Sequence, residues 1–247
     1  MTVTKVQREK IALYVRNYII RTAERHGHQN ALFRANARWM HTLNVGHNLE
    51  LILKGEKASE YSADVCRVAA LFHDVDHYTV QQEYHAARGA ETATRFLTKE
   101  GYDAEFIKLV ATAIREHDRD LNDEIPVEDQ VRKIVETLSL ECRMLIDADT
   151  LDKIGANNIL QAVTSLANTE KRQVSDIARE LNSGWPLQRA RLWKDMLSTP
   201  TGIAMGDQRF GFYQRFLQQI ETEIVMVDPY PELKQTQQLS PLTLPHH

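Results

Sequence analysis

The chain has 247 residues, of which 43% are hydrophobic and 26% charged, so it holds enough apolar side chain to build a core. Its 30 Lys and Arg against 34 Asp and Glu give a net charge of −4, which offers no extended basic surface for nucleic acid. With only two cysteines, a disulfide framework is excluded. The sequence shows no secretory signal, and no apolar run approaches the length of roughly 18 residues that a membrane span needs. We therefore expect a cytoplasmic protein without a membrane span.

Apolar residues recur at spacings of three and four, and glycine and proline are scarce, which together predict an all-α fold. Helices are expected over about 4–25, 30–53, 59–73, 83–101, 103–118, 126–155 (as one run or with a kink), 157–182 and 187–227. Composition does not change across residues 182–186, so we expect a turn there and a single domain over residues 1–227. Residues 228–247 hold four of the seven prolines and are expected to form an irregular tail.

The clearest chemical signal is an apolar helix that runs directly into His73 and Asp74. Packing alone does not call for this pair at the end of a buried stripe. Six of the ten histidines fall between His41 and His117. Imidazole and carboxylate groups together suit Zn, Mn or Fe(II), so the sequence predicts a metal site.

The order of these residues resembles the HD superfamily, in which a histidine, a His-Asp pair and a distant aspartate bind a metal inside a helical bundle. His41 is similar to the first motif, His73 and Asp74 to the pair, and Asp149 in Ala-Asp-Thr-Leu to the last. The resemblance covers about residues 30–155. It implies an HD-type helical bundle with additional N- and C-terminal helices, the latter over about 157–227. Residues 147–156 are also similar to a stretch of uncharacterised bacterial HD hydrolases.

Two further histidines extend the resemblance toward HD proteins with two metals. His85, four residues before a glycine, and His117, at a helix end, are similar to their additional ligands. The resemblance thus implies one or two divalent ions (Mn, Fe, Zn, Co, Ni or Mg), with Asp74 or Asp149 as a bridge and a metal-activated hydroxide as nucleophile. Residues near these ligands are candidates for proton transfer (Asp147 and Asp118) and for neutralising phosphate charge (Arg38, Arg88 and Arg115).

One position departs from the family pattern. HD members with a His-Asp-x-Gly-Lys motif place a lysine where this chain has His77, so that lysine contact to phosphate is expected to be missing. His77 lies four residues after His73, and it would be an extra ligand if the helix continued. His47 should face away from His41, so a solvent or packing role is expected.

The resemblance implies hydrolysis of a phosphate ester or anhydride in a small phosphorylated molecule, such as a nucleotide. Two alternatives stay open: an HD-type di-iron oxygenase, and a non-catalytic metal-bound regulatory protein. Four aromatic residues at helical spacing are expected to pack in the core or to contact another copy of the chain in a homo-oligomer: Phe210, Phe212, Tyr213 and Phe216.

Overall fold

The computed structural model describes residues 2–26, 30–79, 81, 84–118, 125–168 and 171–224, and every regular element in them is an α-helix. The helices are α1 (Lys5–Arg25), α2 (Ala31–Gly55), α3 (Glu60–Phe72), α4 (His85–Lys99), α5 (Ala104–His117), α6 (Val127–Thr137), α7 (Leu140–Asp152), α8 (Ala156–Asn168), α9 (Val174–Ser183), α10 (Trp185–Asp195) and α11 (Pro200–Glu223). The predicted all-α fold is confirmed. Over these described ranges, none of the helices combines the length and apolarity that a bilayer crossing requires.

Short polar side chains cap the first turn of several helices. Thr4 forms a reciprocal capping box with Gln7 at the start of α1, and Ser59 accepts a backbone hydrogen bond at the start of α3. Asp103 does the same for α5 and Ser139 for α7. Each cap satisfies backbone N–H groups that have no partner inside the helix, so these residues fix where the helices begin.

Three of the expected helical runs are divided in two. The run 126–155 breaks at Leu138, whose extended backbone separates α6 from α7. The run 157–182 contains α8 and α9, and the run 187–227 contains α10 and α11, with Pro200 in the first turn of α11 because proline has no N–H to donate. Glu83 and Val227, expected as helix ends, and the tail 228–247 lie outside the described residues.

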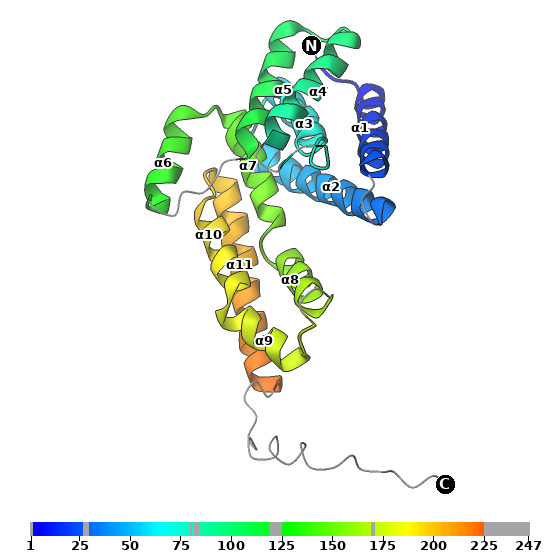
Figure 1. Ribbon diagram of the computed structural model, residues 1–247. Helices are drawn as coiled ribbons and strands as arrows, with labels where there is room; N and C mark the ends of the chain where they lie inside the picture. Colours follow the sequence, from blue (N-terminus) through cyan, green and yellow to red (C-terminus); the bar gives the residue numbers. More distant parts are fainter. Residues whose placement is uncertain are drawn as a thin grey trace, which may run out of the picture.

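Helix α7 lies at the centre of the molecule. Figure 1 shows α1 to α5 gathered at one end and α8 to α11 at the other, and α7 contacts α2, α3 and α5 as well as α10 and α11. Leu145, Ala148 and Leu151 of α7 are fully buried, and a continuous hydrophobic core extends from Val3 to Ile220. Because α7 is packed from both sides, its polar residues are also held in fixed surroundings.

Candidate metal centre

His73 and Asp74 lie in the turn that follows α3. Backbone hydrogen bonds close successive tight turns there, so the chain leaves the helix at this point. Asp76 anchors the turn, because its buried carboxylate accepts hydrogen bonds from Tyr18 of α1 (2.9 Å) and from Thr92 of α4 (2.5 Å). These contacts to two other helices hold the His-Asp pair in a defined position.

A glycine brings α4 close to this turn. A Cβ atom on Gly89 would lie 3.1 Å from the carbonyl oxygen of Phe72 and 3.2 Å from that of His73. Because glycine has no side chain, the two backbones can approach each other. His85, one helical turn before Gly89, therefore reaches Asp74: its Nε2 atom lies 3.1 Å from Oδ1 of Asp74. This close approach is a physical reason for the glycine four residues after His85.

Six predicted ligands converge on one point, and we call them the histidine–aspartate cluster. They are His41 of α2, His73 and Asp74 after α3, His85 of α4, His117 of α5 and Asp149 of α7. The Nε2 atoms of His41 and His73 are 3.2 Å apart, and those of His85 and His117 are 3.3 Å apart. All six are buried except His41, which is partly buried.

The second nitrogen of each imidazole is held by an acceptor outside the cluster. In His73 and in His117, Nδ1 lies 2.7 Å from the backbone carbonyl oxygen of the residue three positions earlier. A carbonyl oxygen can only accept a hydrogen bond, so each of these Nδ1 atoms carries the proton. Nδ1 of His41 lies 2.7 Å from Asp152, and Nδ1 of His85 lies 3.3 Å from Asp118. These contacts fix the ring orientations and direct Nε2 of each imidazole into the cluster, as is usual for histidines that bind metals.

This donor set fits a divalent metal ion. Lone pairs of two neutral imidazoles repel each other at the observed separations of 3.2 and 3.3 Å unless a proton or a cation lies between them. Two nitrogen ligands that each lie about 2.1 Å from one metal are themselves about 3 Å apart. Three overlapping groups have ligand atoms within 4.8 Å of one another: His41, His73 and Asp149; His73, Asp74 and His117; and Asp74, His77 and His85.

Asp74 divides its two carboxylate oxygens between the two histidine pairs. Oδ2 lies 3.3 Å from Nε2 of His41 and 3.5 Å from that of His73. Oδ1 lies 3.1 Å from Nε2 of His85 and 3.7 Å from that of His117. A carboxylate placed in this way can contact two cations at once, one on each side.

The part of the chain that carries this cluster matches a known family. A family model of the HD domain matches residues 38–154, which include all six residues of the cluster. The chain contains an HD domain. A search of curated proteins found no match to the sequence.

Solved structures share the fold beyond the HD domain itself. A predicted HD superfamily hydrolase from an uncultured Thermotogales bacterium is 24% identical, with a TM-score of 0.53 over 83% of this chain and 90% of its own. An HD-superfamily hydrolase from Bacillus thuringiensis is 18% identical, with a TM-score of 0.62 over 89% and 97%. Bacillus subtilis YpgQ, solved in complex with ADP, is 20% identical, with a TM-score of 0.58 over 90% and 100%. The helices outside residues 38–154 therefore belong to the same fold.

The electrostatics of the HD site keep His73 neutral and Asp149 ionised, which are the forms in which they bind cations. Burial lowers the pKa of His73 to about 3, so this imidazole is neutral at physiological pH. Burial opposes ionisation of Asp149, but the ammonium group of Lys153 holds its pKa well below the usual range. Burial also lowers the pKa of His41, yet hydrogen bonds to Asp149 and to other carboxylates raise it overall to about 11. A bound metal ion would replace the proton of His41.

The structure brings two of the proposed catalytic residues to the HD site. Arg38 hydrogen-bonds to Asp74 and stacks over the ring of Tyr78, with 5.9 Å between its guanidinium carbon and the ring centre. Asp118, with a side chain 33% exposed, contacts His85. Both residues line a cavity of about 770 Å³ next to the cluster.

The structure does not bring Arg88, Arg115 or Asp147 to this cavity. Arg88 pairs with Glu91 on the exposed side of α4 at 2.7 Å, and Arg115 is exposed on α5. The carboxylate of Asp147 points to the start of α11, where it accepts hydrogen bonds from Ser198 and Thr199. The expected roles of these three residues in catalysis are therefore not supported by their positions.

Sequence reasoning missed two residues at the HD site: Asp152, the last residue of α7, and Lys153, which follows it. Asp152 orients His41, and the Nζ atom of Lys153 lies 2.8 Å from Oδ2 of Asp149. Both could have been found from helical spacing, because residues three and four positions after Asp149 share its face of α7. A lysine is thus present at the site, although it comes from a different position than in the family motif.

His77 reaches the site by another route than the one expected. α3 ends at Phe72, so His77 does not share a helical face with His73. The turn nevertheless places its ring 5.6 Å from that of His85, and His77 lines the cavity. Its buried Nδ1 has no hydrogen-bond partner among the described residues.

Helices beyond the HD match complete the wall of the cavity. α8 contributes Gln161, Thr164 and Ser165, and α10 contributes Trp193. The sequence left open whether the helices after Gly155 close over the site. In the structure they form one side of it.

Proposed function

We propose that this protein hydrolyses a phosphate ester or anhydride in a small molecule with the help of one or two divalent metal ions. The observation that carries the proposal is the placement of Asp74 between two pairs of imidazoles, beside the cations Arg38 and Lys153. HD superfamily hydrolases among the structural neighbours support the same general reaction.

The histidine–aspartate cluster would hold the metal. His41, His73 and Asp149 supply one group of donors, His85 and His117 supply a second, and Asp74 faces both. A divalent cation at such a site supplies an ionised water near neutral pH and draws charge from phosphoryl oxygens. Asp152 and Asp118 keep the rings of His41 and His85 turned toward the cluster.

The two cations of the cavity wall would bind the phosphate group. In the structure Arg38 pairs with Asp74, and Lys153 pairs with Asp149. When these carboxylates coordinate a metal, part of their charge is neutralised, so the guanidinium and ammonium groups can contact a phosphate oxygen instead. Asp118 is partly exposed and lines the same cavity, where it could accept a proton during the reaction.

The cavity suits a substrate about as large as a nucleotide. Its volume of about 770 Å³ exceeds that of a phosphate ion by far, so an organic group would fill the remainder. The polar side chains of α8 can hydrogen-bond to such a group, and the ring of Trp193 can pack against it. That YpgQ was solved in complex with ADP supports a nucleotide as the first compound to test.

A phosphate-release assay tests the proposal. Protein loaded with Mn, Co, Ni, Mg or Fe(II) would be incubated with mononucleotides, dinucleotides and simple phosphate esters. We expect metal-dependent release of phosphate, and its loss in the Asp74→Ala variant. Oxygen uptake by the iron-loaded protein without phosphate release would favour the oxygenase instead, and no metal-dependent turnover of any compound would contradict the proposal.

A variant of Lys153 tests its contact with the substrate. Lys153→Met should raise KM about tenfold, the loss expected for one charge-assisted hydrogen bond, and leave the metal content unchanged. Lys108→Met, an exposed lysine of α5 that pairs with Glu105, is the matched control. An unchanged KM in Lys153→Met would remove this lysine from the substrate site.

A further inference from the structure

A second cavity lies behind the HD site, on the side of α11. It has a volume of about 560 Å³ and is lined by α2, by the end of α7 and the residues after it, and by α11. Asp152 is the one lining residue that both cavities share among the described residues. Its Oδ2 atom contacts His41 on the HD side, so the two cavities lie on either side of this carboxylate.

Two arginines of α11 bring positive charge to the second cavity. Arg209 is partly buried and donates hydrogen bonds to the carbonyl oxygen of Leu151 (2.5 Å) and to Oδ1 of Asn48 (2.6 Å). Both acceptors are neutral, and no ion pair joins Arg209 to a carboxylate within the described part of the chain. Burial lowers the pKa of Arg209, and the negative charge of Asp152 offsets this effect only in part.

Arg215 has neither a hydrogen bond nor an ion pair to any residue that the structure describes. Its guanidinium group points toward the preceding turn of α11: Nη1 would lie 3.5 Å from a Cβ atom placed on Gly211. It therefore lies near the helix backbone at the border of the cavity, where it stays exposed to solvent. The two arginines thus offer unused N–H donors to the same cavity.

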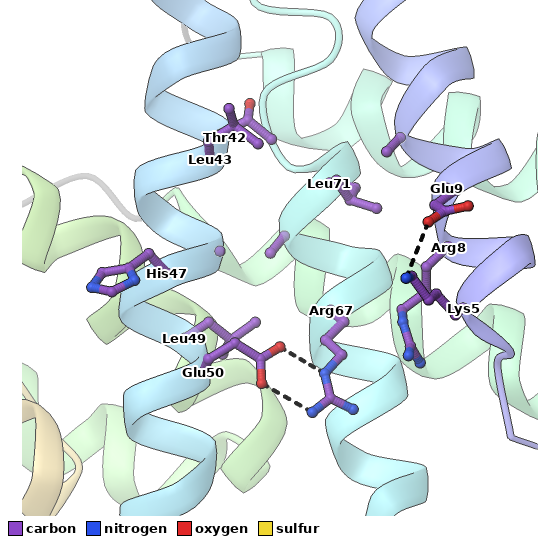
Figure 2. A pocket seen from close by; sticks show the side chains of 13 residues that line it. Lys5, Arg8, Glu9, Thr42, Leu43, His47, Leu49, Glu50, Arg67 and Leu71 are labelled. Carbon is purple, nitrogen blue, oxygen red and sulfur yellow. Dashed lines mark hydrogen bonds and ion pairs between the residues drawn. The ribbon is translucent and has the colours of Figure 1, made fainter.

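The cavity between α1, α2 and α3 provides a contrast. It also contains cations, but each is paired: Lys5 with Glu9, Arg8 with Asp64, and Arg67 with Glu50. Figure 2 shows the pairs of Lys5 and Arg67, and it shows His47 on the side of α2 away from α3. His47 borders the second cavity from that side. Unpaired cations therefore distinguish the second cavity from the first.

An aromatic ring completes the second cavity. Phe212 is 42% exposed although it borders a hollow, and it lies three residues from both Arg209 and Arg215 on α11. Each arginine is therefore a helical neighbour of Phe212, and all three side chains border the cavity. A planar group could stack on the ring while an attached anion contacts the arginines. The ring of Phe212 stacks on that of Phe216, with 6.4 Å between the ring centres, and it does not border the HD cavity.

We propose that this second cavity binds a small metabolite that carries a phosphate group and a planar group. The phosphate would accept hydrogen bonds from Arg215 and Arg209, and the planar group would lie on Phe212. Asp152 limits how deep the anion can enter, because its own negative charge lies at the inner end. The site is separate from the HD site, and its occupation requires no hydrolysis.

Calorimetric titration with phenylphosphonate tests this site. The probe carries a ring and a phosphorus oxyanion joined by a C–P bond, so a phosphate-ester hydrolase does not consume it. With the metal-loaded full chain we expect a binding component that survives in Asp74→Asn. Arg215→Gln should weaken this component about tenfold, as for one lost charge-assisted hydrogen bond, and leave phosphate release at the HD site unchanged. Arg16→Gln, an exposed arginine of α1, is the matched control.

A second variant tests the place of the ring. Phe212→Leu should weaken phenylphosphonate about threefold and leave the binding of inorganic phosphate unchanged, because only the ring contact is lost. Equal binding of phenylphosphonate by wild type, Arg215→Gln and Phe212→Leu would overturn the proposal. Its loss in Asp74→Asn alone would also overturn it, because the only anion site would then be the HD site.

Discussion

Two aspartates of α7 lie two residues apart and are both buried, yet they meet opposite surroundings. Asp149 contacts His41 at 3.1 Å and Lys153 at 2.8 Å, and its pKa lies well below the usual range because Lys153 offsets the effect of burial. Asp147 accepts backbone hydrogen bonds from Ser198 (3.0 Å) and Thr199 (2.7 Å), and burial raises its pKa to about 6.

Helical geometry explains the difference. Residues two apart on an α-helix point about 200° away from each other, so α7 presents one carboxylate to the HD site and the other to the start of α11. A Cβ atom on Gly202 would lie 2.3 Å from Oδ2 of Asp147, which shows how closely α11 packs on it. The same residue type thus serves metal binding on one face, as we propose, and helix packing on the other.

Removing Asp149 should have the largest effect. Asp149→Ala takes a charged donor from the cluster, so metal affinity should fall by more than about 100-fold, beyond the loss typical for residues that only orient a ligand. Metal content and competition with a chelator would measure the loss, and circular dichroism would check the fold. Asp147→Ala is the matched comparison and should keep its metal. Equal metal affinity in the two variants would contradict the division between the faces of α7.

Removing Asp147 should instead weaken the folded state. Asp147→Ala leaves buried N–H and hydroxyl donors of Ser198 and Thr199 without their acceptor, which should lower the free energy of unfolding by about 3 kcal/mol. Urea unfolding monitored by circular dichroism measures this change. Asp176→Ala, a partly exposed aspartate paired with Arg179, should change stability by less than about 0.5 kcal/mol. A loss no larger than this control would show that Asp147 does not hold α11.

The pKa of Asp147 makes its contribution depend on pH. Its pKa rises from 3.8 to about 6 on folding, so the folded state binds this proton more tightly than the unfolded chain. The resulting stability is complete below about pH 4 and is lost as pH rises through about 6, by at most about 3 kcal/mol. Asp147→Asn has no such proton, so the difference in unfolding free energy between wild type and variant should change over this range. Parallel curves would contradict the raised pKa.

The sequence predicted the helices better than the points where they end. Regular apolar spacing indicates helix but continues across a break, so it predicts helices over 157–182 and 187–227 without a boundary inside either run. Local chemistry decides the break before α11, where Thr199 caps the helix and Pro200 occupies its first turn. This pair is visible in the sequence and could have marked the boundary.

The six residues of the cluster were expected from the order of motifs, and the structure brings them together. The sequence could not decide whether Arg88, near His85, and Arg115, near His117, point into the cavity. Their direction depends on how α4 and α5 pack, which helical spacing alone does not give. Asp152 was missed for a different reason. It binds no metal in the motif pattern, and its role appears only when His41 of α2 lies beside α7 in three dimensions.

Asp152 should have the smallest of these effects, because it acts through His41. Its carboxylate accepts the Nδ1 proton of His41, which leaves Nε2 to face the cluster. The amide of Asp152→Asn can donate to Nδ1 instead and would then move the ring proton to Nε2, so metal affinity should fall about 10- to 100-fold. Chelator competition measures this change, with the exposed Asp129→Asn, whose carboxylate pairs with Arg132, as control. An affinity equal to that of the control would show that the orientation of His41 does not depend on Asp152.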